Sequence, residues 1–276
     1  MDRVALRAAL AESRFENITV VDSIDSTNRA LLAWAVAGRD PDGSLIADGS
    51  VLIARSQTAG RGRLGRTWIA PPDSALLMTV LLEPGVLSIE RWPLLSFAMG
   101  MAVVERANEH GLPATLKWPN DVVVSDATTQ VGYRKLAGIL AESHVGQRQR
   151  FVVVGVGVNL RRPAQLDPGL GSDAVPTWFD DHVPLESAER YTADVLRSFA
   201  QFVDLLTTQP TTFVARYRSG CATIGKNVAA DLGTQRITGV AVDVDESGHL
   251  LIDEHTPSGP FRHVLSAGDV VHLRPT

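Results

Sequence analysis

The sequence is poor in cysteine and in long apolar runs, and each shortage excludes a class of protein. Its 276 residues hold one cysteine, Cys221, which excludes a disulfide scaffold. The longest uncharged apolar run, Trp92 to Val104, has 13 residues, fewer than the roughly 18 that a membrane-spanning helix needs. The N-terminus mixes Arg with Asp and Glu and has no apolar signal core. We therefore expect a cytoplasmic protein with no membrane partner.

The overall composition is that of a folded chain with a slight acidic excess. Apolar residues make up 45% and charged residues 21%, which excludes a disordered protein. This length allows one large domain, or one of roughly 200 residues followed by a small one. The net charge of −5 disfavours non-specific binding to nucleic acid, so we expect no DNA partner.

Lysine is also scarce. Of the 26 Lys and Arg residues, three are lysines, namely Lys117, Lys135 and Lys226. Codon bias can replace lysine by arginine on a protein surface with little effect on stability. A lysine that persists in such a chain indicates a position that needs the compact charge of an ammonium group and not the planar guanidinium group of arginine.

Periodicity and turn residues predict a part that contains both helices and strands, followed by a part made of short strands. We expect helices at 3–12, 26–38, 88–109, 185–207 and 211–219, and strands at 18–22, 51–56, 75–82, 115–117, 122–125, 135–143 and 151–159. Residues 161–183 read as a long loop. Five short strands after Gly220, at 228–232, 237–244, 250–253, 263–265 and 270–273, predict a small barrel. The predicted domains are therefore 1–220 and 221–276.

The most unusual segment is the one from Gly60 to Thr67, which we call the glycine–arginine loop. Three glycines alternate with three arginines there, and no acid occurs between Gly49 and Pro72. Such a backbone approaches a ligand closely and surrounds it with N–H groups and cations, which suits a phosphate or a carboxylate. The spacing is nearly that of a Walker A loop, but Arg66 stands where that loop requires Lys and no helix follows. A solvated loop and a nucleic-acid contact remain as alternatives.

Two further patterns place polar chemistry on predicted strands. Residues 155–160 read Gly-Val-Gly-Val-Asn-Leu, but the helix of a dinucleotide-binding turn is missing, which indicates a strand that a ligand or backbone approaches closely. Lys117 and Lys135 lie in apolar strands, where an unpaired charge costs several kcal/mol. Each lysine therefore needs a partner, which is either a salt bridge to Asp121 or Glu142 or the anion of a ligand.

Other chemistries find little support. The seven histidines show no zinc-ligand spacing, no Gly-x-Ser-x-Gly elbow is present, and Cys221 has no nearby histidine. Ser26, Thr27 and Asn28 are typical of a helix N-terminus, so a capping role stays open for them.

Taken together, five strings in one order resemble the biotin protein ligases. They are Asp25-Ser26-Thr27-Asn28, Gln57-Thr58-Ala59-Gly60-Arg61-Gly62-Arg63 with Trp68, Lys117-Trp118-Pro119-Asn120-Asp121, Lys135-Leu136-Ala137-Gly138-Ile139-Leu140 and Gly155-Val156-Gly157-Val158-Asn159. The resemblance spans about residues 20 to 274. It implies an α+β fold, with a mixed-sheet catalytic domain of the class II synthetase type and a C-terminal SH3-like β-barrel. Some members begin with a helix-turn-helix domain, for which the roughly 20 residues before the first string are too few, so we expect no operator binding.

The resemblance also implies the reaction and its site. Biotin and ATP would form biotinyl-5′-adenylate with Mg²⁺ as activator, and biotin would pass to a lysine of a biotin carboxyl carrier protein. The biotin site would comprise Ser26, Thr27, Asn28, Gln57, Gly60, Arg61, Gly62, Arg63, Lys135 and Gly138. The ATP or adenylate site would comprise Arg63, Arg66, Trp68, Lys117, Asn120, Lys135, Gly157 and Asn159. Lys135 and Arg61 would be the catalytic cations, and Asp121 the metal ligand.

This chemistry fits the residues, because joining two anions calls for cations and oriented N–H groups and for no protein nucleophile. The nearest alternative is a lipoate or octanoyl ligase or transferase on the same fold. The polar set Ser26, Thr27 and Gln57 favours the ring of biotin over an acyl chain. We expect a monomer or a weak homodimer.

Overall fold

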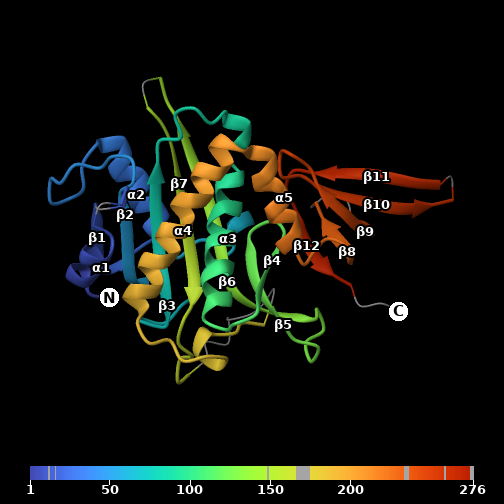
Figure 1. Ribbon diagram of the computed structural model, residues 1–276, viewed down its shortest axis with the longest axis horizontal. Helices are drawn as coiled ribbons and strands as arrows, with labels where there is room; N and C mark the ends of the chain where they lie inside the picture. Colours follow the sequence, from blue (N-terminus) through green and yellow to red (C-terminus); the bar gives the residue numbers. More distant parts are fainter. Residues whose placement is uncertain are drawn as a thin grey trace.

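The computed structural model describes residues 1–11, 13–15, 17–147, 149–165, 175–232, 236–257 and 259–273. A seven-stranded mixed sheet forms its larger part (Figure 1). The strands follow the order β1-β2-β3-β7-β6-β5-β4, and β1 pairs with β2 in parallel while the other neighbours pair antiparallel. Their bounds are β1 Ile18–Ile24, β2 Val51–Gln57, β3 Ala75–Leu82, β4 Ala114–Lys117, β5 Asp121–Ser125, β6 Tyr133–Val145 and β7 Arg150–Asn159.

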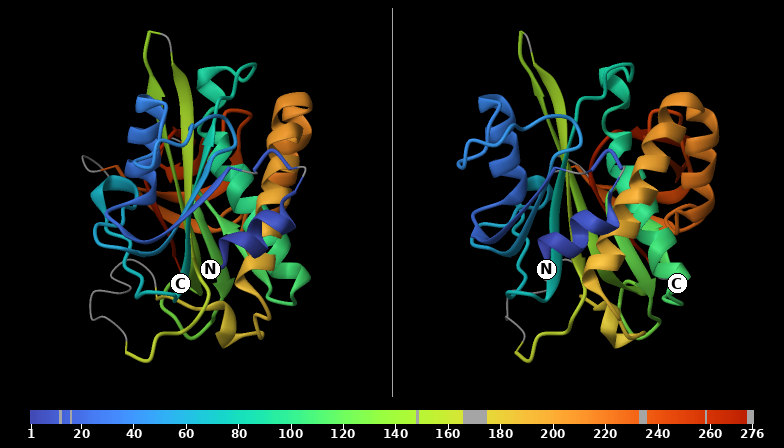
Figure 2. Two further views of the ribbon diagram at one scale, coloured as in Figure 1. Left: turned by 90° about the vertical axis from the view of Figure 1, so that its left-hand side faces the viewer. Right: turned by 60° about the vertical axis from the view of Figure 1, so that its left-hand side comes forward.

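Helices cover the two faces of this sheet unequally. On one face lie α1 (Arg3–Ala9), α3 (Leu94–Glu109) and α4 (Ala188–Thr208), and α2 (Thr27–Ala37) lies on the other, as Figure 2 shows. The main apolar core packs beneath α3 and α4. A smaller core joins α2 to the sheet through Leu31, Leu52 and Val153. Because α2 covers one part of its face, the rest of that face is left for a site.

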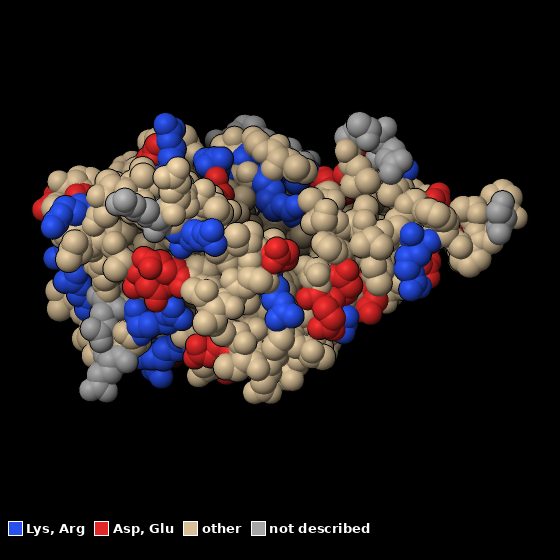
Figure 3. Space-filling model, turned by 90° about the horizontal axis from the view of Figure 1, so that it is seen from above, with Lys and Arg blue, Asp and Glu red and all other residues tan. Residues whose placement is uncertain are grey.

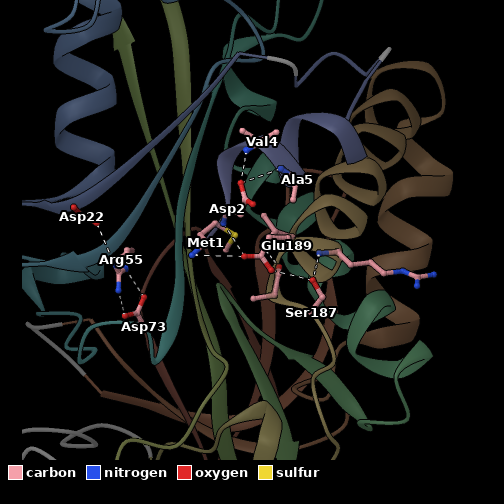
Figure 4. Close-up of polar contacts among 12 residues, drawn as sticks. Met1, Asp2, Val4, Ala5, Asp22, Arg55, Asp73, Ser187 and Glu189 are labelled. Carbon is pink, nitrogen blue, oxygen red and sulfur yellow. Dashed lines mark hydrogen bonds and ion pairs between the residues drawn. The ribbon is translucent and has the colours of Figure 1, made fainter.

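Hydrogen bonds at the N-terminus hold α1 against α4 (Figure 4). The carboxylate of Asp2 caps α1 by accepting from the backbone N–H of Val4 at 2.8 Å and of Ala5 at 3.3 Å. The backbone N–H of Asp2 donates to Glu189 Oε1 at 2.9 Å, in the first turn of α4. Ser187 caps α4 in turn by accepting from Arg190 N–H. Caps of this kind contribute about 1 kcal/mol each.

The third predicted helix was too long at its start. Residues 88–109 form a 3₁₀ turn, Ile89–Arg91, followed by α3, which begins at Leu94. The break lies at Pro93, which has no N–H to donate and is tolerated at a helix start but not in a helix interior. The first helix likewise ends at Ala9. In the predicted loop 161–183, residues 166–174 lie outside the described residues, and a 3₁₀ turn, Phe179–Asp181, occupies part of the remainder.

The C-terminal part is a five-stranded antiparallel sheet of order β11-β10-β9-β8-β12 that follows α5 (Pro210–Gly220). Its strands are β8 Asn227–Asp231, β9 Arg236–Val244, β10 Leu250–Thr256, β11 Gly259–Leu265 and β12 Asp269–His272. It lies beside the β4 edge of the large sheet (Figure 1). Trp118 joins the two parts, because its indole Nε1–H donates to Gly248 O at 2.9 Å and its backbone N–H to Thr223 Oγ1 at 3.1 Å.

The apolar core runs without interruption from the large sheet into the C-terminal sheet. The domain division at Gly220 therefore stays a prediction, although α5 ends at that residue. Among the helices of the described residues, none combines the length and the apolarity that crossing a bilayer would require.

Candidate active site

The candidate site is a cavity at the edge of the large sheet where the parallel strands β1 and β2 end. Chain direction places two segments there: α2 begins just after β1, and the glycine–arginine loop follows β2. The other walls come from β6, β7, the turn between β4 and β5, and the start of β12. The lining residues include Ser26, Thr27, Asn28, Gln57, Arg61, Gly62, Arg63, Arg66, Trp68, Lys117, Asn120, Asp121, Lys135, Gly138, Gly157 and Asp269.

Glycines of two neighbouring strands form the floor of the cavity. Gly138 of β6 lies directly opposite Gly157 of β7, and the indole of Trp68 lies over this pair. A Cβ atom at Gly157 would come within 2.5 Å of Trp68 Cε2, and one at Gly155 within 1.9 Å of Asn28 Oδ1. No real Cβ contact is so short, so these positions need glycine. The buried Nε1 of Trp68 has no hydrogen-bond partner among the described residues.

A buried hydrogen-bond network organises the start of α2. Gln57 Oε1 accepts from Thr27 N at 2.8 Å and from Thr27 Oγ1 at 3.0 Å. Asn28 Oδ1 accepts from Thr79 Oγ1 at 2.8 Å, and Asn28 Nδ2 donates to Leu140 O at 3.0 Å. The side-chain amide of Asn28 thus has its hydrogen-bond partners within the protein, and Asn28 forms part of the cavity wall.

Capping does not account for the side chain of Ser26. Ser26 occupies the N-cap position of α2 and is buried, but its side chain makes no capping hydrogen bond. It lines the cavity instead. The Nε2 group of Gln57 also donates to no described residue, which leaves two polar groups for a ligand.

The glycine–arginine loop is a small hairpin. Trp68 N donates to Gly60 O at 3.0 Å, Arg61 bridges Thr67, and Gly62 N donates to Arg66 O at 2.7 Å. A Cβ atom at Gly60 would lie 2.3 Å from Trp68 O, so the first of these contacts requires glycine. The three arginines therefore sit on a defined backbone.

The three arginines of the loop contact three different elements. Arg61 Nη1 pairs with Glu142 Oε1 of β6 at 2.8 Å, and Arg66 pairs with Asp269 of β12. Arg63 Nη1 donates to the amide oxygen of Asn120 at 3.3 Å and forms no ion pair with a described residue. Burial lowers the pKa of Arg63 from its ordinary value. A desolvated guanidinium without a carboxylate partner is suited to bind an anion.

Both strand lysines share one carboxylate. Lys135 Nζ lies 2.7 Å from Asp121 Oδ1, and Lys117 Nζ lies 3.5 Å from Asp121 Oδ2. Burial acts to raise the pKa of Asp121, but the two ammonium groups outweigh it and lower the pKa. The salt-bridge interpretation of both lysines is thus confirmed, with Asp121 as the partner. One carboxylate cannot neutralise two ammonium groups, so excess positive charge remains beside Trp68, whose ring lies 5.6 Å from Lys135 Nζ.

The described residues do not fit a metal site held by the protein. Asp121, the predicted Mg²⁺ ligand, is engaged by two lysines, and the amide oxygen of its neighbour Asn120 accepts from Arg63. No group of three His, Cys, Asp or Glu side chains is placed to share a metal ion in the described part of the chain.

The structure brings together all but two of the predicted site residues. Gly60 supports the loop from outside the cavity, and Asn159 donates its side-chain amide to Lys135 O at 3.3 Å and to Thr177 O at 3.2 Å instead of lining it. Sequence reasoning missed Asp269 and Thr79. Thr79 could have been recognised from the sequence, since it is a polar residue inside the apolar strand β3. Nothing in the sequence indicates Asp269, because 203 residues separate it from Arg66.

Two family models match this chain. One describes the biotin/lipoate A/B protein ligase family and matches residues 20–159, and the other describes the biotin protein ligase C-terminal domain and matches residues 223–273. The biotin–[acetyl-CoA-carboxylase] ligase of Mycobacterium tuberculosis is 38% identical, with 99% of this chain and 96% of the relative covered. The bifunctional ligase/repressor BirA of Escherichia coli is 28% identical, with 86% of this chain and 70% of the relative covered.

A solved structure shows the same fold. The biotin protein ligase of Aquifex aeolicus in complex with biotin and ATP superimposes with a TM-score of 0.74 at 24% identity, covering 94% of this chain and all of that one. Identity at this level argues for the fold alone. The two family models and the M. tuberculosis relative carry the assignment further: this chain belongs to the biotin/lipoate A/B protein ligase family, and its C-terminal sheet is the C-terminal domain of the biotin protein ligases.

Proposed function

We propose that this protein is a biotin–protein ligase that activates biotin with ATP and transfers it to a lysine of a carrier protein. In the first step a biotin carboxylate oxygen attacks the α-phosphorus of ATP, forming biotinyl-5′-adenylate and releasing pyrophosphate. In the second step a neutral lysine amine attacks the acyl carbon, AMP leaves with the bonding electron pair, and the amine nitrogen loses a proton to solvent as the amide forms. Neither step needs a nucleophile from the enzyme.

One observation carries this proposal, namely the excess of cations around a cavity with a neutral polar end. Arg61, Arg63, Arg66, Lys117 and Lys135 line it, against the acids Asp121 and Asp269. A carboxylate and a triphosphate repel each other, and cations fixed between them reduce that repulsion and stabilise the charge of the transition state. Lys135 and Arg63 would contact the reacting anions, because Lys135 shares its carboxylate and Arg63 has no carboxylate partner among the described residues.

The neutral end of the cavity supports biotin over lipoate. Ser26 and the Nε2 group of Gln57 offer polar contacts beside the start of α2, and Thr27 holds Gln57 in place. A cyclic urea can use such donors and acceptors, whereas the dithiolane ring of lipoate cannot. The match to the biotin protein ligase C-terminal domain supports the same choice.

The partner we propose is a biotin carboxyl carrier domain, such as that of an acetyl-CoA carboxylase, named for the M. tuberculosis relative. The reaction would take place in the cytoplasm, where ATP is available. On the face seen in Figure 3, basic and acidic side chains are interspersed, which supports a protein partner over a nucleic-acid backbone.

The deciding experiment measures the mass of a carrier domain after incubation with the protein, biotin, ATP and Mg²⁺. We expect the carrier to gain the mass of one biotinyl group on a single lysine, and to gain none when ATP is omitted. Excess lipoate should not compete with biotin. A carrier that acquires lipoate, or whose mass does not change under any condition, would refute the proposal.

A further inference from the structure

We propose that Asp269, on the C-terminal sheet, is a positioning residue that keeps the glycine–arginine loop closed over the activated intermediate by holding Arg66. The inference deepens the proposed function and rests on it. It gives the C-terminal sheet a defined task in the chemistry of a cavity that is otherwise built from the large sheet. That task falls to a carboxylate that no sequence pattern indicates.

The contact between Arg66 and Asp269 differs from the other contacts of the loop. Arg61 reaches Glu142 in β6, and Arg63 reaches Asn120 in the turn between β4 and β5, so both contacts stay within the larger part of the molecule. Arg66 instead pairs with Asp269, and among the contacts described for the loop arginines this pair reaches the C-terminal sheet. Its two side chains are 37% and 32% exposed, so solvent screens the pair in part and not in full.

Asp269 stands on a strand that is paired and anchored at both ends. Asp269 is the first residue of β12, which pairs along its whole length with β8, and the next residue, Val270, is fully buried. At the other end of β12, His272 contacts Thr223 Oγ1 at 3.1 Å. Strand pairing and the burial of Val270 thus fix the backbone that carries the carboxylate.

The hairpin passes this restraint on to the arginine that faces the cavity. Gly62 N donates to Arg66 O at 2.7 Å, and Arg66 N donates to Arg63 O at 3.1 Å, so the backbone of Arg66 determines where the tip of the loop lies. Holding Arg66 therefore holds Arg63. Asp269 also acts on Arg63 electrostatically, because its negative charge favours the charged form of that guanidinium.

A closed loop matters most after the first step of the reaction. Biotinyl-5′-adenylate is a mixed anhydride that water hydrolyses to biotin and AMP, and a loop that covers it excludes water and retains it until the carrier arrives. Loss of the Asp269 contact also loosens Arg63, so adenylation should slow somewhat, but the larger effect should be that the intermediate escapes or hydrolyses. The measurable sign is pyrophosphate released without biotin transferred.

The test compares Asp269→Asn with Asp269→Glu and with a matched control, Asp253→Asn. Asp253 is an aspartate on the same sheet whose carboxylate pairs with Arg262 on the adjacent strand at 2.7 Å. With saturating carrier, we expect Asp269→Asn to raise the ratio of pyrophosphate released to biotin transferred by about threefold or more, the change expected for losing a partly exposed ion pair. Asp269→Glu should restore most of the coupling, and Asp253→Asn should match the wild type.

Limited trypsin digestion provides a readout that needs no activity, because the loop contains three cleavable arginines. We expect Asp269→Asn to be cut between residues 61 and 67 several-fold faster than the wild type and Asp253→Asn. Equal cleavage rates together with an unchanged ratio would overturn the role of Asp269. Wild-type protein that releases no pyrophosphate with biotin would instead refute the proposed function, while the digestion would still decide whether Asp269 holds the loop.

Discussion

At the scale of single residues, Asp121 explains how two lysines coexist in apolar strands. Lys117 is 5% exposed, and a lone ammonium group there would be strongly destabilised. Asp121 offers one oxygen to each lysine, at 3.5 Å and 2.7 Å. The shared carboxylate holds both ammonium groups in place and leaves excess positive charge, so the salt bridge does not exclude the anion contact that we propose for Lys135.

Replacing Lys135 by alanine should reduce adenylation without unfolding the protein. The loss of one charge-assisted contact predicts a decrease of roughly 10- to 150-fold in kcat/KM, equivalent to about 1.5–3 kcal/mol. Asp121 keeps Lys117 as its partner, so the midpoint of thermal unfolding should change little. Biotin-dependent exchange of pyrophosphate into ATP measures the first step alone. The control is Lys226→Ala, which removes an exposed lysine. If Lys135→Ala were as active as Lys226→Ala, the assignment of Lys135 would be contradicted.

At the scale of elements, the glycines of β6 and β7 form the floor of the cavity, because they carry no side chains above the sheet. Gly138 and Gly157 are paired across the two strands, and the indole of Trp68 occupies the space that side chains would take. The ring can lie there because the loop hairpin brings Trp68 back to Gly60. Strand register and loop geometry thus cooperate to place one aromatic ring beside Lys135.

A methyl group at Gly157 should displace this ring. The Cβ atom of a Gly157→Ala variant would meet Trp68 Nε1 at 2.7 Å, so the indole must move away from the floor. We expect the KM for ATP to rise about tenfold or more, which corresponds to about 1.4 kcal/mol, while the KM for biotin changes less. Gly85→Ala is the control, because its Cβ atom would meet nothing within 4 Å. An unchanged KM for ATP would show that Trp68 does not contact the adenylate.

At the scale of the whole molecule, the joint between the two sheets contains a buried histidine. His272 of β12 contacts Thr223 and lies against the ring of Tyr133 at 5.1 Å between centroids. Burial lowers its pKa to about 4, and the charges of Lys117 and Lys226 act in the same direction. His272 is therefore neutral in the folded protein near neutral pH.

This histidine predicts a loss of stability in acid. In the unfolded chain the pKa of His272 returns to about 6.5, so below that pH the unfolded state binds a proton that the folded state does not. Its contribution to the free energy of unfolding should fall by about 3 kcal/mol between pH 6.5 and pH 4. Urea unfolding at pH 7 and pH 4.5 measures this loss, which should be smaller in His272→Gln than in His255→Gln, a variant of an exposed histidine. Equal losses in the two variants would rule out the buried neutral state.

The sequence by itself predicted the order of the strands along the chain and, through its resemblance to the biotin protein ligases, the class of reaction and most of the residues that line the cavity. Local patterns suffice for the strands, because alternation of apolar residues, glycine and turn residues act over a few neighbours. Strings such as residues 57–63 and 117–121 each present their functional groups from one short segment. Even Pro93, which makes α3 begin later than predicted, is a local signal.

Only the tertiary structure decided which charges meet. The pairing of Arg66 with Asp269, of Arg61 with Glu142 and of Lys135 with Asp121 depends on strand register and on the joint between the sheets. Residues 203 positions apart share no local pattern, because their contact exists only once two sheets have packed. The physical reason is that burial and turn preferences are properties of short segments, whereas electrostatic partners are chosen by the packing of the whole chain.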